Sequence, residues 1–350
     1  MPQDPIVIDG SQGEGGGQIL RTSVGLAAAM GIPVRIVNVR AGRPQPGLRP
    51  QHLAAVRAAA AVCDGQLEGA EVGSMALTFR PGEVRAGRYR FDIGTAGSTT
   101  LVLQTILPAI ALAPGESDVI VTGGTHNPLA PCFEYLRDVF GVLASAANVQ
   151  AYFEMVRPGF YPAGGGEVRM QVLGVDYRDD LIPLRLGSRG ELRRVEGLSA
   201  VSASLPEHVG RRQAQRASSR LAAAGHTATV EQAAWQTFCP GTAVFLRAVF
   251  SRSVAGFFSL GARGKPAEKV ADEAVDELLG FLSSPGAVDA HAADQLITVA
   301  ALCPDRSSIS TARVTDHLLT NAHVIRQLTG RGVAIDAEPG RPGTVTVQAQ

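Results

Sequence analysis

The stretch IDGSQGEGGGQILRTS, residues 8–23, places a glycine-rich turn between two regular segments. The flanking residues PIVIDG predict a short strand, and QILRTSVGLAAAMG predicts a helix. Unpaired amides and the helix dipole at such a turn favour a bound anion. The turn lacks the GxxxxGK[ST] spacing of a P-loop, and the chain's only lysines are Lys265 and Lys269. We therefore expect another kind of phosphate site.

The same order of segments returns later in the chain. YRFDIG, TAGSTT, LVLQTILPAIALA and DVIVTGG, within residues 89–124, read as strand, turn, helix and strand. Gly17 and Gly97 fall at matching places, each just before the helix. A fainter third copy contains AADQLITVAALC, residues 292–303. The sequence therefore predicts an α/β (α+β) fold with a large domain of three repeated sheet-and-helix units.

Residues 184–276 have a different pattern. ELRRVEGLSAVSASL, HVGRRQAQRASSRLAAAG, HTATVEQ and TAVFLRAVF predict a strand, a helix and two further strands. That is enough for a small α/β domain inserted into the larger one. We expect the large domain to comprise residues 1–183 and 277–350, and the inserted domain residues 184–276.

Composition limits the classes of function. The 32 basic and 32 acidic residues balance, so general electrostatic binding of nucleic acid is not predicted, and any RNA contact must come from a local cluster. The four cysteines are widely spread without zinc spacing and predict buried thiols. The N-terminus has no signal-peptide pattern, and the longest apolar stretch is interrupted by Gln104 and Pro108. We expect a soluble, cytoplasmic protein with no membrane contact.

The glycine turn carries an acidic and a basic candidate. Glu14 would repel an anion unless a cation lay between them, so the turn suggests a ligand for Mg²⁺ or Mn²⁺. Arg21 falls about one helical turn further on, where a guanidinium can bind a phosphate. The alternative is a tight loop that binds nothing.

Four further motifs carry weaker signals. RAGRPQPGLRPQH, residues 40–52, gathers arginines that are either solvated or clamp a terminal phosphate. THNPLAP, residues 125–131, predicts a rigid loop. RPGFYPAGGGEV, residues 157–168, predicts a chain reversal or a close backbone contact. DHLLTNAH contains His317, and a lone histidine is more often structural than catalytic.

In this order, these motifs resemble those of the RNA 3′-terminal phosphate cyclase family. The likeness extends from the glycine turn to HLLTN and includes GTAGSTTLVLQ, GGTHNPLAP, GFYPAGGG and ADQL. The family has Arg or His directly before the glycine of GFYPAGGG. This chain departs from that pattern with Pro158, preceded by Arg157.

The resemblance implies an ATP-dependent ligase that converts the 3′-phosphate end of RNA to a 2′,3′-cyclic phosphate. His317 would attack the α-phosphorus of ATP and form a histidine–AMP intermediate. AMP would pass to the RNA 3′-phosphate, and the ribose 2′-OH would then expel AMP. A Mg²⁺ or Mn²⁺ ion would assist, and the resemblance also allows a homodimer.

The resemblance also implies site residues and a fold. Glu14 would hold the metal, and His317 would be the nucleophile. The expected ATP-binding residues are Gln104, Pro131, His291, Asp294 and Gln295. The expected contacts to phosphates of ATP or of the RNA end are Arg21, Arg40, Arg43, Gln51 and His52. The fold would contain three βαβαββ-like units, as in the enolpyruvyl transferases, with a small inserted domain.

Two other interpretations stay open. One is a non-catalytic, cyclase-like RNA-binding protein of ribosome biogenesis, although such relatives lack the histidine of HLLTN. The other is an enolpyruvyl-transferase-like enzyme, which would need a lysine- and arginine-rich site and would give ADQL and HLLTN no purpose.

Overall fold

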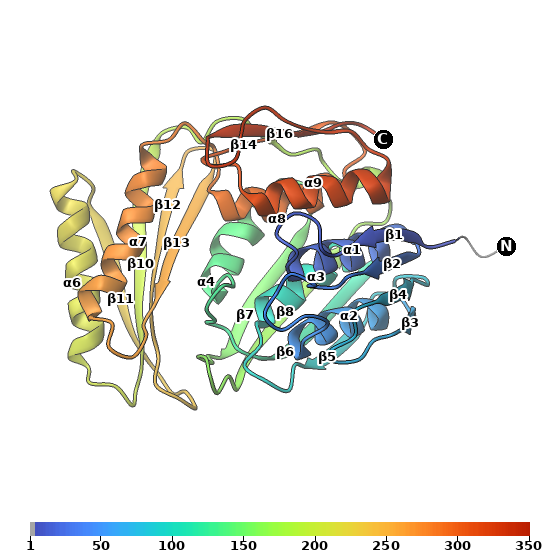
Figure 1. Cartoon of the computed structure of the whole chain (residues 1–350). Helices are drawn as coiled ribbons and strands as arrows, with labels where there is room; N and C mark the ends of the chain where they lie inside the picture. The colour runs from blue at the N-terminus through green and yellow to red at the C-terminus, as the bar shows by residue number, and fades with distance from the viewer. Residues whose placement is uncertain (1–3) are drawn as a thin grey trace.

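The computed structural model describes residues 4–350 and contains four mixed sheets of four strands each, covered by helices. It confirms the predicted α/β class. Figure 1 shows the sheet of β10 to β13, with α6 and α7, standing beside the rest of the molecule, and α8 and α9 lying across the larger part beneath β14 and β16. Within residues 4–350, no helix combines the length and the apolar character needed to cross a membrane.

The first sheet has the strand order β1-β2-β4-β3. Its first two strands are parallel, so a crossover must connect them, and α1 provides it. The remaining pairs are antiparallel. The elements are β1 (Ile6–Asp9), α1 (Gly17–Met30), β2 (Val34–Val37), α2 (Pro50–Val62), β3 (Gln66–Glu68) and β4 (Leu77–Arg80).

The second sheet has the order β5-β6-β8-β7, again with one parallel pair joined through a helix. A short helical run that includes a π-helical turn connects β6 to β7. The elements are β5 (Arg88–Asp92), α3 (Thr99–Ile110), β6 (Gly115–Gly123), α4 (Phe133–Tyr135), η1 (Leu136–Phe140), α5 (Gly141–Ser145), β7 (Gln150–Arg157) and β8 (Gly166–Gly174).

The third sheet, with the order β9-β14-β16-β15, is built from segments far apart in the chain. Its first strand ends at residue 186, and its other strands begin at residue 307 or later. The elements are η2 (Arg178–Asp180), β9 (Arg185–Leu186), α8 (Ala290–Ala300), β14 (Ser307–Thr311), α9 (Asp316–Thr329), β15 (Val333–Ile335) and β16 (Gly343–Val347).

The fourth sheet, with the order β11-β10-β12-β13, lies in the segment expected to be inserted. The predicted strand, helix and two strands are present there, and β13 and α7 join them. The elements are β10 (Leu192–Ser202), α6 (His208–Ala223), β11 (Ala228–Trp235), β12 (Thr242–Phe250), β13 (Val254–Leu260) and α7 (Ala267–Leu282). The expected boundary at residue 276 falls inside α7, which packs on α6, β12 and β13. Residues 185–186 pair with β14, outside this sheet.

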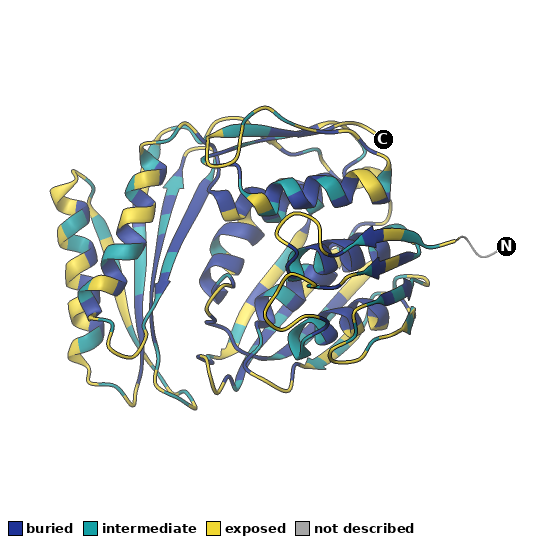
Figure 2. Cartoon of the chain, viewed as in Figure 1, coloured by how far each residue is buried: buried dark blue, intermediate teal, exposed yellow. Residues whose placement is uncertain are grey.

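The described residues form two buried apolar clusters, and the larger one also takes in Phe245 and Val254 of the fourth sheet. The larger one contains the apolar faces of α1, α2, α3, α8 and α9 and of the sheets beneath them. The smaller one lies between α6, α7 and the fourth sheet, with α7 contributing Val270, Ala274 and Leu278. In Figure 2 the sides of α6 and α7 that face their sheet are buried, and much of the outward side of α6 is exposed. Because Val270, Ala274 and Leu278 recur every four residues, they form one apolar stripe along α7.

Candidate active site

The glycine turn leads from β1 into α1 and requires glycine for two reasons. Gly13 and Gly15 have φ angles of +57° and +56°, a left-handed conformation that favours glycine. A Cβ on Gly16 would lie 2.9 Å from Nη2 of Arg43, and one on Gly17 would lie 2.3 Å from Nε2 of His52. Gly16 and Gly17 therefore let the side chains of Arg43 and His52 approach the backbone closely.

His317 is the second residue of α9, and Thr315 caps this helix by accepting the Leu318 N–H. Nδ1 of His317 lies 3.0 Å from Oε2 of Glu14, although no hydrogen bond joins the two groups. Arg43 lies 3.8 Å from the same carboxylate oxygen and donates to the Glu14 carbonyl at 3.1 Å. Residues from α9, the glycine turn and the 40–52 loop therefore meet at one point.

Burial lowers the pKa of His317, and the charge of Arg21 acts in the same direction, while Glu14 opposes them. The imidazole is therefore neutral at physiological pH. Burial likewise lowers the pKa of His52 to about 3, helped by Arg21 and other arginines nearby. Two neutral imidazoles thus flank the arginines, and a neutral imidazole retains the lone pair that a nucleophile needs.

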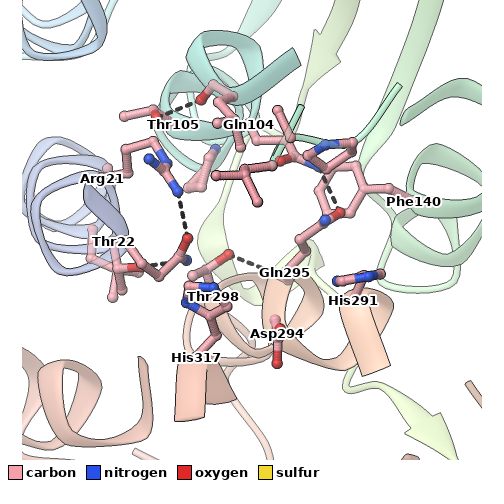
Figure 3. Close-up of a pocket in the computed structure, with 18 of the residues that line it drawn as sticks. Arg21, Thr22, Gln104, Thr105, Phe140, His291, Asp294, Gln295, Thr298 and His317 are labelled. Carbon is pink, nitrogen blue, oxygen red and sulfur yellow. Dashed lines mark hydrogen bonds between the residues drawn. The ribbon is translucent and has the colours of Figure 1, made fainter. Parts of the chain in front are cut away.

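A cavity of about 370 Å³ opens beside His317. Arg21 and Thr22 of α1, Gln104 of α3 and the residues of α8 surround it (Figure 3). All five expected ATP-binding residues line this cavity, from α3, the 125–131 loop and α8: Gln104, Pro131, His291, Asp294 and Gln295. Segments far apart in the chain meet there, and Nε2 of Gln104 donates to Oε1 of Gln295, 191 residues away, at 2.6 Å.

Burial also shifts the pKa values of Arg21 and Asp294 in the cavity. Burial lowers the pKa of Arg21 to about 10, so the guanidinium stays protonated, and it donates to Oε1 of Gln18 at 2.7 Å. Burial raises the pKa of Asp294 to about 8, even though Thr315 donates a hydrogen bond to it. Asp294 is therefore mainly protonated at pH 7 and can act as a hydrogen-bond donor.

Asn321 links three helices behind the cavity. Its Oδ1 accepts from the Thr22 hydroxyl at 2.7 Å, and its Nδ2 donates to the Asp294 carbonyl at 2.6 Å. These buried bonds connect α1, α8 and α9. Because a buried amide loses stability when left unpaired, they hold the three helices in one arrangement. Asn321, the asparagine of the HLLTN motif, thus helps to position the helices that form the walls of the cavity.

The remaining expected phosphate contacts lie behind the glycine turn. Arg40 donates to the carbonyls of Gln45 and Gly47, at 2.7 and 3.0 Å, and so supports its own loop. Oε1 of Gln51 accepts the Ser98 N–H at 3.0 Å and connects α2 to the second glycine turn. Arg40, Gln51 and His52 are absent from the cavity lining, whereas Arg21 belongs to it.

The sequence analysis did not predict that the fourth sheet and its helix α7 contribute to the cavity. Phe258 of β13 and Glu277 of α7 both line the cavity. Burial raises the pKa of Glu277, while the charge of His291 opposes this effect. Neither residue belongs to a motif, so no local signal in the sequence indicates its role.

A second cluster lies in the 125–134 segment. His126, Cys132 and Glu134 are buried, and their potential ligand atoms lie within 4.8 Å of one another, as in a metal site. Nε2 of His126 is 2.8 Å from Oε2 of Glu134, and Nδ1 is 2.8 Å from the Thr125 hydroxyl. The histidine and glutamate therefore satisfy each other without an ion. Cys132, Cys63 and Cys303 are buried free thiols, as predicted, whereas Cys239 is partly exposed.

The basic helix α6 is not an open cationic surface. Three of its arginines form ion pairs with carboxylates of α7, each at 2.7 Å: Arg212–Glu268, Arg216–Asp272 and Arg220–Asp276. Charges that are neutralised in this way contribute little to counterion release on binding a nucleic acid. We therefore expect nucleic-acid contacts near the glycine turns rather than on α6.

The fold and the site define an α/β protein in which a neutral histidine and a glutamate lie beside a polar cavity lined by an arginine. The chain belongs to the RNA 3′-terminal phosphate cyclase family, whose model matches residues 12–335. It is 48% identical to an RNA 3′-terminal phosphate cyclase of Methylococcus capsulatus over 91% of this chain and 89% of the relative. The protein of that name in Hyperthermus butylicus is 46% identical over 92% and 91% of the two chains. The one in Pyrococcus furiosus is 40% identical over 98% of both.

Proposed function

We propose that this chain is an enzyme that converts the 3′-phosphate end of RNA into a 2′,3′-cyclic phosphate and consumes ATP. The observation that carries the proposal is the position of His317. Its neutral imidazole stands 3.0 Å from Glu14, at the edge of a cavity of about 370 Å³ that Arg21 lines. A cavity of this volume falls within the range of small-molecule sites and is large enough for an adenylate.

In the first step, Nε2 of His317 attacks the α-phosphorus of ATP. The new N–P bond replaces the P–O bond to pyrophosphate, which leaves. Nδ1 faces Glu14, so Nε2 is the free nitrogen, and the carboxylate stabilises the positive charge that forms on the ring. Arg21 and Arg43 offset the negative charge that develops on the phosphates.

In the second step, an oxygen of the RNA 3′-phosphate attacks the same phosphorus, and the N–P bond breaks. His317 is regenerated, and the RNA end carries AMP through a phosphoanhydride. In the third step, the adjacent ribose 2′-OH attacks the RNA phosphorus. AMP leaves with the bridging oxygen, the hydroxyl proton passes to solvent, and the cyclic diester remains. A neutral histidine suits the first two steps because its phosphoramidate is a good donor.

A divalent metal fits the donor set near His317. Glu14 presents a half-exposed carboxylate beside the place where phosphates would lie, and Mg²⁺ is often held by one or two carboxylates and substrate phosphates. We propose that Glu14 supplies this oxygen ligand to Mg²⁺ or Mn²⁺. When bound, the ion would neutralise phosphate charge. Arg43 hydrogen-bonds the Glu14 carbonyl and so orients the ligand residue.

We also propose that the first three sheets are copies of one βαβαββ unit, as in the enolpyruvyl transferases. The support is their common strand order, since β1-β2-β4-β3, β5-β6-β8-β7 and β9-β14-β16-β15 follow one scheme. The fourth sheet would be an insertion of about residues 188–286. Arg189 donates to the carbonyls of Phe281, Leu282 and Gly286, and so joins the entry of this segment to its exit.

The test is incubation with α-³²P-ATP and Mg²⁺ or Mn²⁺, without RNA. The wild type should acquire a label that acid removes and alkali spares. His317→Ala should acquire none. His323→Ala, which changes a histidine on the same helix, is the matched control and should label normally. A second assay would follow cyclisation of an RNA oligonucleotide that ends in a 3′-phosphate.

Absence of label on the wild type with either metal, in folded samples, would contradict the nucleotidyl mechanism. Equal labelling of His317→Ala would contradict the role of this residue. RNA binding without label or cyclisation would favour the non-catalytic interpretation.

A further inference from the structure

The loop between β7 and β8 carries the GFYPAGGG motif, which the cavity does not use. Gly164 and Gly165 have φ angles of +67° and +71°. A Cβ on Gly165 would lie 2.0 Å from the ring of Phe238, a residue in the loop between β11 and β12. Because Gly165 has no side chain, the ring of Phe238 can rest directly on the backbone of the β7–β8 loop.

Aromatic and cationic side chains are exposed at this contact. Phe238 is 72% exposed and Tyr161 is 60% exposed. The Arg157 guanidinium lies 5.7 Å from the centroid of the Phe238 ring and donates to the Gly165 carbonyl. A guanidinium on an aromatic face is weakly attracted to it, and both groups can stack on nucleobases.

The exposed rings are mounted on a fixed support. Sγ of Cys239 lies 3.3 Å from the Phe160 carbonyl, and Gly241 packs against the Phe160 ring. Phe160 itself is buried and tilts against Trp235 and His126. Little conformational entropy is therefore lost when a ligand covers Phe238 and Tyr161.

A continuous set of contacts leads from this surface to the phosphate-binding region. A Cβ added to Gly164 would lie 2.8 Å from Cα of Ala96, and one added to Gly97 would lie 3.0 Å from Cβ of Gln51. Gln51 also accepts the Ser98 N–H and precedes His52, which packs on Gly17. The loop that carries Tyr161 and supports Phe238 is thus connected, through packed neighbours, to the residues proposed to hold the RNA end.

We infer that the RNA strand leading to the 3′-phosphate runs over Phe238, Tyr161 and Arg157. Bases upstream of the terminal nucleotide stack on the two rings, and the guanidinium adds stacking and backbone attraction. The inference rests on the proposed function. A single strand is the occupant that fits, because isolated aromatic rings beside a cation suit stacked bases. A protein partner would instead require a broad apolar patch.

The test compares Phe238→Ala and Tyr161→Ala with the wild type on two substrates. One is a single-stranded RNA of ten nucleotides with a 3′-phosphate, and the other is a dinucleotide 3′-phosphate, which keeps a single upstream base. Loss of one stacked base should raise KM for the ten-nucleotide RNA by about 5- to 100-fold. KM for the dinucleotide should rise less than KM for the ten-nucleotide RNA, and RNA-free labelling by α-³²P-ATP should stay unchanged. Tyr152→Ala removes a ring that is 62% exposed on β7 and is the matched control.

A KM for the ten-nucleotide RNA within twofold of wild type in both variants would overturn the inference while leaving the proposed function intact. Equal losses on both substrates and in labelling would also overturn it, since they indicate a structural role. A thermal unfolding curve for each variant separates that case from misfolding. A wild type that neither labels nor cyclises would refute the proposed function, and this inference with it.

Discussion

Replacing Gly17 with alanine tests whether the glycine turn exists to admit the side chains packed against it. The new Cβ would lie 2.3 Å from Nε2 and 2.8 Å from Cδ2 of His52, and 3.0 Å from Nη1 of Arg21. Favourable contacts between non-bonded heavy atoms begin near about 3.5 Å. The imidazole must therefore retreat by about 1 Å, although its Nδ1 is held by the Arg49 N–H.

A displacement of this size is expected to impair catalysis far more than stability. A misplacement of about 1 Å in a catalytic constellation can cost about 100-fold in rate. Gly17 is the first residue of α1, where alanine is a better helix former by up to about 1 kcal/mol. We therefore expect about 100-fold slower cyclisation, with the free energy of unfolding changed by less than about 1 kcal/mol.

The assay measures initial rates of histidine labelling and of RNA cyclisation, together with urea unfolding. Gly280→Ala is the matched control, because Gly280 lies in the exposed part of α7 and no atom lies within 4 Å of its added Cβ. This control should keep full activity and gain about 0.5–1 kcal/mol of stability. A Gly17→Ala enzyme within threefold of wild type in both reactions would refute the reasoning.

Two further predictions concern stability. Asp294 has a pKa of about 8 in the folded chain, against 3.8 for an unperturbed aspartate. Between these two pH values folding takes up a proton, so the free energy of unfolding falls by up to about 1.4 kcal/mol for each unit by which the pH rises. Asp294→Asn should flatten this slope in urea unfolding at pH 5, 6 and 7, and parallel slopes for the two proteins would contradict the assignment. Gly25→Ala would place a Cβ 2.5 Å from the Thr105 carbonyl oxygen, so α1 and α3 must separate at a cost of about 1–3 kcal/mol. A change below about 0.5 kcal/mol in the same measurement would show that the helices adjust freely.

Local sequence patterns predicted much of the fold. The strand, glycine turn and helix at residues 6–30 follow from periodicity and from the glycines themselves, and the structure has them there. The same reading found β10, α6, β11 and β12 in the fourth sheet. It did not assign α7 to that sheet, since an amphipathic stripe predicts that a helix face is buried but not which sheet covers it.

The cavity likewise contains residues that the sequence predicted and residues that it did not. The resemblance predicted a role for His317 and for the five expected ATP-binding residues, and all six line one cavity in the structure. Phe258 and Glu277 line the same cavity without belonging to any motif, because only the packing of the fourth sheet against α8 and its neighbours brings them near. The pKa of Asp294 is likewise a property of burial by distant segments.

The sequence by itself determined the elements and the residues that carry chemistry, because helix periodicity, turn glycines and motif spacing act over a few neighbouring positions. Tertiary structure alone decided that Glu14 and His317 stand 3.0 Å apart across some 300 residues of chain. It also decided that the Arg40 guanidinium turns to its own loop and that Phe238 lies over Gly165. These contacts join segments whose separation in sequence carries no information about their distance in space, so packing of the complete chain must fix them.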